Sequence, residues 1–192
     1  MIFNDWPWRQ WRQQRGESQA LRLNNQALSW RQLCARVDAL AAGFAEQGVT
    51  EGQGVALRAY NQPQTLLAWL ALLQCGARVL PLNPQLPLAL LQELLPALTV
   101  QYQLTLNGDA LPVALPTLTL QAAAGTHAVP WRGERFASMT LTSGSTGLPK
   151  AAVHSANAHL ASAAGVLALM PFAAEDDWLL SLPLFHVSGQ GI

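Results

Sequence analysis

Glycine, hydroxyl and lysine side chains are concentrated in residues 139–150, whose sequence is MTLTSGSTGLPK. The first four residues favour a half-buried strand. Gly144 and Gly147 then permit backbone angles that other residues avoid, so main-chain N–H groups can turn toward an anion, and Lys150 adds a positive charge. This chemistry is typical of a loop that wraps a polyphosphate, and the alternative is a surface turn that is merely rich in serine, threonine and glycine. The predicted cradle consists of Thr142, Ser143, Gly144, Ser145, Thr146, Gly147 and Lys150.

The stretch differs from the P-loop of nucleotide triphosphatases, which places glycine before its lysine and serine or threonine after it. Here Pro149 precedes Lys150 and Ala151 follows it. A second segment, Pro183–Gly189 with the sequence PLFHVSG, follows a predicted strand at residues 178–182. Because ligands bind at the carboxyl ends of parallel strands, we expect both segments at one edge of a sheet.

Together the two segments resemble the adenylate-forming superfamily, which includes acyl- and aryl-CoA synthetases, luciferases and the adenylation domains of peptide synthetases. TSGSTGLPK is similar to the phosphate-binding signature of that superfamily, and PLFHVSG is similar to its P-L-F-H-x-x-G segment. From end to end the chain most resembles one branch, the 2-succinylbenzoate–CoA ligases of bacterial menaquinone synthesis. The residues that carry this closer resemblance are Trp6–Trp8, Leu66–Leu70 and Asn83–Pro87.

The resemblance implies two half-reactions, in which a carboxylate attacks ATP to give an acyl-adenylate and coenzyme A then displaces AMP. The small molecules it implies are ATP with Mg²⁺, coenzyme A and an aromatic carboxylic acid. It also implies that Lys150 neutralises the pyrophosphate or positions the loop. His186 is implied to form a planar wall beside the acyl group, with Ser188 and Gly189 in the same substrate site. The alternative for His186 is a packed histidine at a strand-to-loop corner, and no acid or base partner in the sequence assigns it a proton transfer.

Two residues depart from the pattern of the superfamily: Leu141 replaces an aromatic residue and Ala151 replaces a glycine. The adenine, ribose and Mg²⁺ motifs of the superfamily and its C-terminal lysine are expected beyond Ile192. The chain is therefore predicted to be an N-terminal fragment that is inactive alone. Two alternatives stay open: a ligase for another acyl or aryl acid, and a truncated, non-catalytic module that binds nucleotide.

The composition limits the partners. Charged residues make up 11% of the chain, against about 25% in typical proteins. This low content predicts that something other than solvent covers part of the surface of the chain. The net charge is zero and no basic run occurs, so nucleic-acid binding has no electrostatic support. The longest apolar run, Leu66–Leu73, is far shorter than the ~20 residues of a membrane span, and the first residues lack the basic region and apolar core expected of a signal peptide. These features predict a cytoplasmic protein, and whether it forms a homo-oligomer stays open.

No metal site is predicted. His154 and His159 are five residues apart, whereas two ligands on one helical face are four apart. Residues 175–177 are predicted to be a solvated charged turn, with a Mg²⁺ role as the alternative. Cys34 and Cys75 are predicted to be buried thiols of a reducing compartment, and His127 is predicted to be a solvated loop residue.

Strand and helix patterns alternate along the chain, which predicts an α/β fold with mainly parallel sheets flanked by helices. Residues 1–106 are predicted as a first lobe, 107–135 as a variable connector, and 136–192 as the start of a second lobe that carries the phosphate loop. Asn61 is predicted to cap a helix, and the tryptophans at 6, 8 and 11 are predicted to dock the N-terminal segment. The other predicted elements are a hairpin at 20–28, helices at 29–48, 62–76, 88–95 and 156–170, and strands at 55–60, 78–82 and 100–106.

Overall fold

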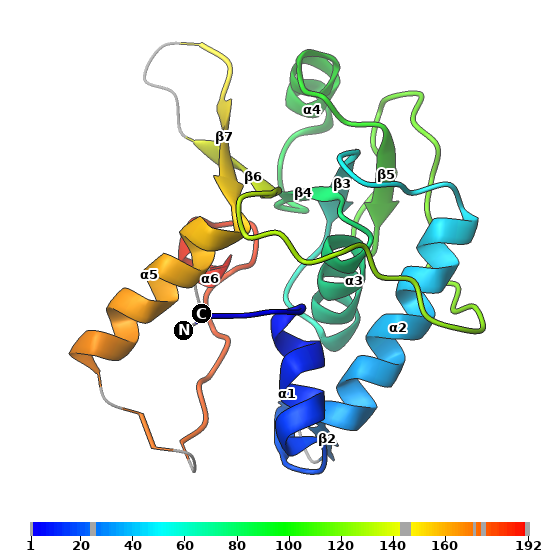
Figure 1. The fold of residues 1–192 in the computed structure, drawn as a ribbon. Coiled ribbons are helices and arrows are strands. Elements are labelled where there is room, and N and C mark those ends of the chain that lie inside the picture. The colour runs from blue at the N-terminus through cyan, green and yellow to red at the C-terminus, as the bar shows by residue number, and fades with distance from the viewer. Residues whose placement is uncertain (1, 24–25, 143–146, 171, 174–175, 191–192) are drawn as a thin grey trace.

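The computed structural model describes residues 2–23, 26–142, 147–170, 172–173 and 176–190. A five-stranded sheet with the order β5-β3-β4-β6-β7 lies at its centre (Figure 1). Four of these strands run parallel, and β7 returns antiparallel to β6. The predicted α/β fold with a mainly parallel sheet is therefore confirmed. The strands are β3 (Gly54–Arg58), β4 (Arg78–Leu82), β5 (Tyr102–Thr105), β6 (Phe136–Thr142) and β7 (Lys150–Ser155).

The helices surround this sheet, and a small hairpin stands apart from it. The hairpin consists of β1 (Gln19–Leu23) and β2 (Gln26–Ser29). Helix α2 begins with a capping box, in which the Ser29 hydroxyl accepts from the Gln32 N–H and the Gln32 side chain accepts from the Ser29 N–H. The helices are α1 (Pro7–Arg15), α2 (Trp30–Glu46), α3 (Pro63–Gln74), α4 (Leu88–Leu94), α5 (Ala156–Leu169) and α6 (Val187–Gln190), with a 3₁₀ turn at Leu95–Ala97.

Two apolar cores lie on opposite faces of the sheet, because alternate residues of a strand point to opposite sides. Val55 and Leu57 of β3 pack on the face covered by α2 and α3. Ala56 of the same strand packs with Leu80 and with Leu91 of α4 on the other face. Every residue of β3 is buried, as expected for a parallel strand covered on both sides. Within the described ranges, no helix is long and apolar enough to cross a membrane.

Helix α1 is docked by tryptophans, as predicted. Trp6 and Trp8 are buried and stack with ring centroids 5.2 Å apart. The Trp8 indole N–H donates to Oε1 of Gln74 at 2.8 Å, which ties α1 to α3. Asp38 of α2 accepts hydrogen bonds from the side chains of three residues, and we call the four residues together the Asp38 cluster. The cluster consists of Arg9, Arg12, Asp38 and Gln74.

The predicted connector, residues 107–135, contains no helix or strand. It lies along the first part of the chain: the carbonyl of His127 accepts from the Gln74 side chain at 2.9 Å, and His127 is half-buried rather than fully solvated. Strand β6, which follows the connector, pairs with β4 through Ser138 and Val79. Strands of both predicted lobes therefore belong to one sheet, and the division of the chain into lobes stays a prediction.

Two local predictions are wrong. The N-cap of α3 is Gln62, not Asn61, and the Asn61 side chain bonds instead to the main chain of residues 182–184. Residues 178–182 form no strand with any described part of the chain. The carbonyl of Leu182, which a strand partner would use, accepts from the Asn61 amide at 2.8 Å.

Candidate functional site

The predicted phosphate loop connects β6 to β7 at the tip of a hairpin. Thr142, the last residue of β6, pairs with Lys150, the first residue of β7, and the Thr142 hydroxyl donates to the Lys150 carbonyl at 3.2 Å. Because β6 runs parallel to β4, this tip lies at the carboxyl ends of the parallel strands, where α/β sheets bind ligands. The four central residues of the predicted cradle, Ser143, Gly144, Ser145 and Thr146, lie outside the described residues.

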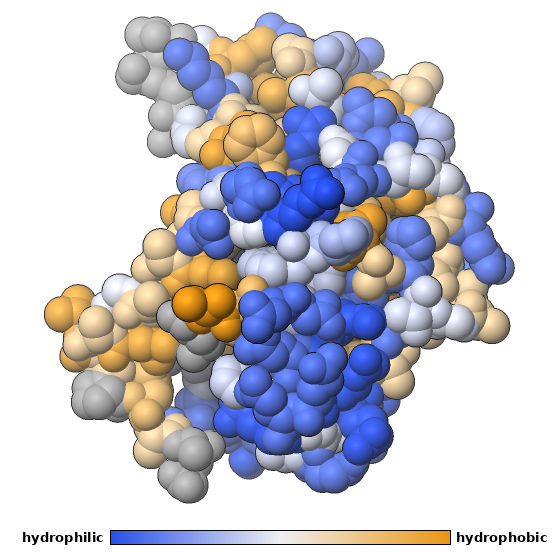
Figure 2. All heavy atoms as spheres, viewed as in Figure 1, coloured by the Kyte–Doolittle hydropathy of each residue, from blue (hydrophilic) through white to orange (hydrophobic). Residues whose placement is uncertain are grey.

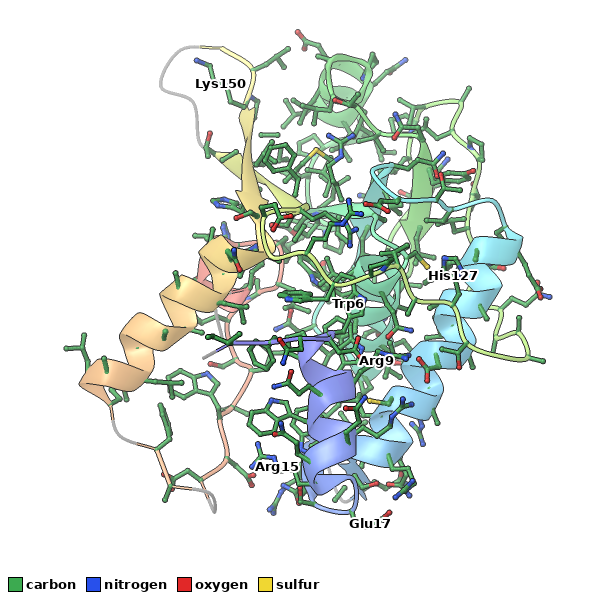
Figure 3. All side chains as sticks on the ribbon, viewed as in Figure 1. Trp6, Arg9, Arg15, Glu17, His127 and Lys150 are labelled. Carbon is green, nitrogen blue, oxygen red and sulfur yellow. The ribbon has the colours of Figure 1, made fainter. Side chains whose placement is uncertain are left out.

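The described residues of the tip face solvent (Figure 3). Gly147 has a φ of +108°, and a β carbon there would meet nothing within 4 Å, so backbone conformation rather than space requires glycine. The Lys150 side chain is exposed, and within the described ranges no carboxylate forms an ion pair with it. An exposed ammonium beside a glycine-containing loop suits the oxygens of a phosphate group.

The two departures from the superfamily pattern lie opposite each other in this hairpin. Leu141 of β6 pairs with Ala151 of β7, and both side chains pack against the core on the α4 face of the sheet. They therefore affect the packing beneath the loop and leave its polar groups unchanged.

The second predicted segment forms a turn that leads into α6. The His186 N–H donates to the Pro183 carbonyl at 3.0 Å, and the His186 carbonyl accepts from the Gly189 N–H at 3.0 Å. The side chains of His186 and Ser188 are exposed among the described residues. Gly189 is buried, and a β carbon there would collide with the carbonyl oxygen of Pro183. Close backbone packing therefore requires glycine at this position.

Buried hydroxyl groups of β6 connect this turn to the strand that carries the phosphate loop. Ser138 and Thr140 point to the same face of β6, and both donate to Oε1 of Gln190 in α6, at 3.1 and 3.2 Å. The Gln190 amide donates in turn to the carbonyl of Leu184 at 3.1 Å. Thr140 is two residues before Thr142, so the turn that contains the second motif is bonded, through Gln190, to the strand that leads into the phosphate loop. In the sequence, hydroxyl residues alternate with apolar residues in β6, and this alternation is a local signal for a row of hydroxyl groups on one face of the strand. No comparable signal in the sequence indicates the contacts of Gln190 or Asn61.

His159 of α5 extends this polar row. Its Nε2 lies 2.8 Å from the Ser138 hydroxyl oxygen. When the Ser138 hydroxyl donates to Gln190, the Nε2 atom of His159 donates to Ser138. Burial, and then the nearby His154, lower the pKa of His159, which favours the neutral imidazole. Among the described residues, no group of three or more His, Cys, Asp or Glu side chains could hold a metal ion.

The predicted charged turn is partly tied to the hairpin β1–β2. Asp177 forms an ion pair with Arg22 at 2.9 Å and accepts from the Gln19 side chain at 3.0 Å. Both ends of the ion pair are more than half exposed, so it stabilises the protein little. Asp177 is exposed, in agreement with the predicted solvated turn, and Glu175 lies outside the described residues.

A cleft of about 1330 Å³ opens beside this row, between α1, α3, the β1–β2 hairpin and α5. Its lining includes Ser138, His159 and Gln190 but neither Thr142 nor Lys150, so the cleft and the hairpin tip are separate features. Helix α5, on one side of the cleft, has no buried residue. Apolar side chains gather over α5 on the surface (Figure 2), among them Leu167 and Leu169. Apolar surface of this kind usually marks a contact with another part of a protein.

Comparisons with known proteins agree on one family. The sequence profile described as AMP-binding enzyme matches residues 8–192. The 2-succinylbenzoate–CoA ligase of Escherichia coli strain K12 is 70% identical over 192 residues, which is 100% of this chain and 43% of that protein. The chain therefore spans less than half the length of this curated relative.

Solved structures show the same relationship. A variant of E. coli MenE with bound OSB-AMS has a TM-score of 0.96 and 69% sequence identity, with coverage of 100% of this chain and 43% of that chain. The Bacillus subtilis o-succinylbenzoate coenzyme A synthetase in complex with AMP has a TM-score of 0.89 at 25% identity, with coverage of 98% of this chain and 52% of that one. The arrangement of helices and strands described above is thus the arrangement in these proteins.

Proposed function

The chain belongs to the AMP-binding enzyme family, and from this premise we propose that it is part of a ligase that joins 2-succinylbenzoate to coenzyme A. The observation that carries the proposal is the 70% identity to the E. coli 2-succinylbenzoate–CoA ligase along the whole chain. This identity extends far beyond the phosphate loop, which members with other acid substrates share. In this role the thioester product serves menaquinone synthesis.

In the first step, a carboxylate oxygen of the acid bonds to the α-phosphorus of ATP, and the bond from that phosphorus to pyrophosphate breaks. Both reactants are anions, so the site must offset their repulsion and hold them in line. We assign the hairpin tip to the β- and γ-phosphates: the loop from Thr142 to Gly147 supplies hydroxyl and main-chain N–H donors, and Lys150 supplies the positive charge. The exposure of Lys150 and the positive φ of Gly147 support this assignment.

In this proposal the acid binds on the side of β6 that faces α6. His186, exposed on its turn, forms a wall beside the acyl group, with Ser188 and Gly189 next to it. In the second step the thiolate of coenzyme A attacks the acyl carbon and AMP leaves. Mg²⁺ bound to the triphosphate supplies further positive charge, and the described residues contribute no cluster of ligands to it.

We also propose that the protein acts in the cytoplasm, where its small-molecule substrates are found, and that residues 107–135 connect two lobes of the complete enzyme. The experiments below use the intact ligase, meaning residues 1–192 followed by the remaining part of the enzyme. The chain's own continuation or the corresponding part of the E. coli relative can supply that part.

An acid-dependent exchange of pyrophosphate into ATP tests the proposed function. The intact ligase should catalyse exchange with 2-succinylbenzoate and release AMP when coenzyme A is added. A panel of benzoate, phenylacetate and medium-chain acids should support at most a few per cent of that rate, about 2 kcal/mol of discrimination. If the ligase prefers another acid, that acid replaces 2-succinylbenzoate as the proposed substrate. If no acid supports exchange, the ligase assignment is refuted.

A further inference from the structure

The main chain of Leu184 is held from both sides by amide side chains. The Leu184 N–H donates to Oδ1 of Asn61 at 2.9 Å, and the Leu184 carbonyl accepts from Nε2 of Gln190 at 3.1 Å. Leu184 is only 6% exposed, so its polar groups need partners inside the protein. Leu184 belongs to no strand or helix. Its main-chain N–H and carbonyl therefore form their hydrogen bonds with these two side chains instead of with the main chain of a neighbouring strand. We call Asn61 and Gln190 the Leu184 clamp.

Each half of the clamp is anchored in a different part of the fold. Asn61 lies in the loop between β3 and α3 and also donates to the Leu182 carbonyl at 2.8 Å. Gln190 is fixed by the hydroxyls of Ser138 and Thr140 on β6. The clamp therefore connects residues 182–184 to the carboxyl end of β3 and to the strand that carries the phosphate loop.

The clamp acts two residues before His186. The turn between them is short and closed by the bond from the His186 N–H to the Pro183 carbonyl, so a shift of Leu184 moves the His186 main chain with it. The imidazole itself is exposed and has freedom to move with that backbone. The position of His186 relative to β6 thus depends on Gln190, which bonds to β6, and on Asn61, which holds Leu184, together with the short helix α6 that follows.

We propose that Asn61 and Gln190 are positioning residues, which hold the turn bearing His186 at a set place beside the phosphate loop and so orient the acid for attack on ATP. This inference rests on the proposed function. Among the described residues, the Lys150 end of the site is connected to the clamp only through β6. Loss of the clamp should therefore impair use of the acid and leave binding of ATP largely intact.

The test compares Asn61→Ala, Gln190→Ala and the double variant in the intact ligase by acid-dependent pyrophosphate exchange. We expect each single variant to lower kcat/KM for the acid about tenfold or more while KM for ATP changes less than about twofold. Because both residues hold the same main-chain unit, the double variant should lose much less than the product of the two single losses. Gln190→Met, which keeps the side-chain length without its polar atoms, serves if Gln190→Ala does not fold.

Gln101→Ala is the matched control. The Gln101 side chain also accepts from a main-chain N–H, that of Gly54 at 2.6 Å, but at the opposite end of β3. This control should lower the melting temperature by a similar amount and leave both kinetic constants within about twofold. The inference fails if the clamp variants behave as this control does, or if KM for ATP and kcat/KM for the acid deteriorate together. The unsubstituted ligase is measured first, on the whole acid panel. If it shows no exchange with any acid, both the proposed function and the clamp are refuted. If it shows exchange but the variants show no selective loss, the clamp alone is refuted.

Discussion

Lys150 is the single lysine of the sequence, and it stands at the tip of the β6–β7 hairpin with its ammonium group in solvent. In the intact ligase, Lys150→Ala should remove one charge-assisted contact to the triphosphate. Such a contact contributes about 1.5–3 kcal/mol, so we expect kcat/KM for ATP to fall about 10- to 150-fold. Pyrophosphate exchange at varied ATP concentration measures this loss.

The control for this substitution is Arg36→Ala, which removes a positive charge from an exposed position of α2. It should leave the exchange kinetics unchanged, because its charge lies outside the proposed site. Lys150→Arg keeps the charge in a different shape and should recover part of the activity. Equal kinetics for Lys150→Ala and the parent enzyme would contradict the assignment of the hairpin tip to the phosphates.

We expect His159 to make the stability of the protein depend on pH. Its pKa is lowered in the folded state, first by burial and second by His154. The unfolded chain therefore binds more protons between the lowered pKa and the ordinary value of about 6.5, so stability rises with pH through that window and is lost on acidification. We expect His159→Gln, whose amide can still bond to Ser138, to lose less free energy of unfolding between about pH 7.5 and about pH 5.5 than the parent protein.

Urea denaturation at the two pH values measures this difference. His154→Gln is the informative control, because it removes the second cause of the shift and should make the pH dependence intermediate. An unchanged pH dependence in His159→Gln would show that other groups govern the acid sensitivity.

Elements with a local signal were predicted well. The apolar periodicity of α2 and α3, the Ser29 capping box and the buried runs of β3 and β4 all describe contacts within a few residues, which the sequence contains directly. The Asn61 cap was wrong because its partner, Leu184, lies 123 residues further along the chain. Residues 178–182 have strand-like composition, but a strand also needs a partner, which the described fold does not give them.

The two halves of the candidate site, the phosphate loop and the Leu184 clamp, also differ in whether their contacts are local in the sequence. The phosphate loop is a continuous motif, so its place at the end of β6 followed from the sequence. The Leu184 clamp joins a loop after β3, the turn after residue 182 and helix α6, and only the folded chain brings these together. Ser138 and Thr140 were visible as hydroxyls in a strand, but the sequence could not identify Gln190 as their partner.

Docking of α1 depends on the Asp38 cluster. The Asp38 carboxylate is only 9% exposed and accepts from Arg9, Arg12 and Gln74. Its removal takes one acceptor from each of these side chains, although Arg9 keeps Asp5 and Gln74 keeps the His127 carbonyl. We expect Asp38→Ala to lower the free energy of unfolding by about 3 kcal/mol, near the low end for a broken buried ion pair, since both arginines are partly exposed. Trypsin should then cleave faster after the arginines of α1.

Glu17→Ala is the control for that substitution. Glu17 pairs with Arg31 beside the same helix, but both side chains are mostly exposed, so its removal should change the free energy of unfolding by less than about 1 kcal/mol. Urea denaturation and timed trypsin digestion compare the two variants. Equal resistance of Asp38→Ala and the parent protein to trypsin would show that the tryptophans alone dock α1.

In the molecule as a whole, the low charge of the sequence and the exposure of α5 both make the surface apolar. Only 11% of residues are charged, and the apolar side chains of α5 pack against no core of the described chain. The chain covers 43% of its E. coli relative. The apolar face of α5 and the open cleft beside it therefore make the 192 residues a poor candidate for independent catalysis.

Residues 1–192 alone should give no pyrophosphate exchange with any acid. The proposed contacts to ATP are a few charge-assisted bonds, and after the loss of translational freedom a net gain of about 4 kcal/mol corresponds to only millimolar affinity. Equilibrium dialysis with ATP should find a Kd near or above about 1 mM for the 192-residue chain, and micromolar affinity for the intact ligase. Measurable acid-dependent exchange by the short chain would show that the hairpin tip and the clamped turn suffice for adenylation, and would make the rest of the enzyme dispensable for its first half-reaction.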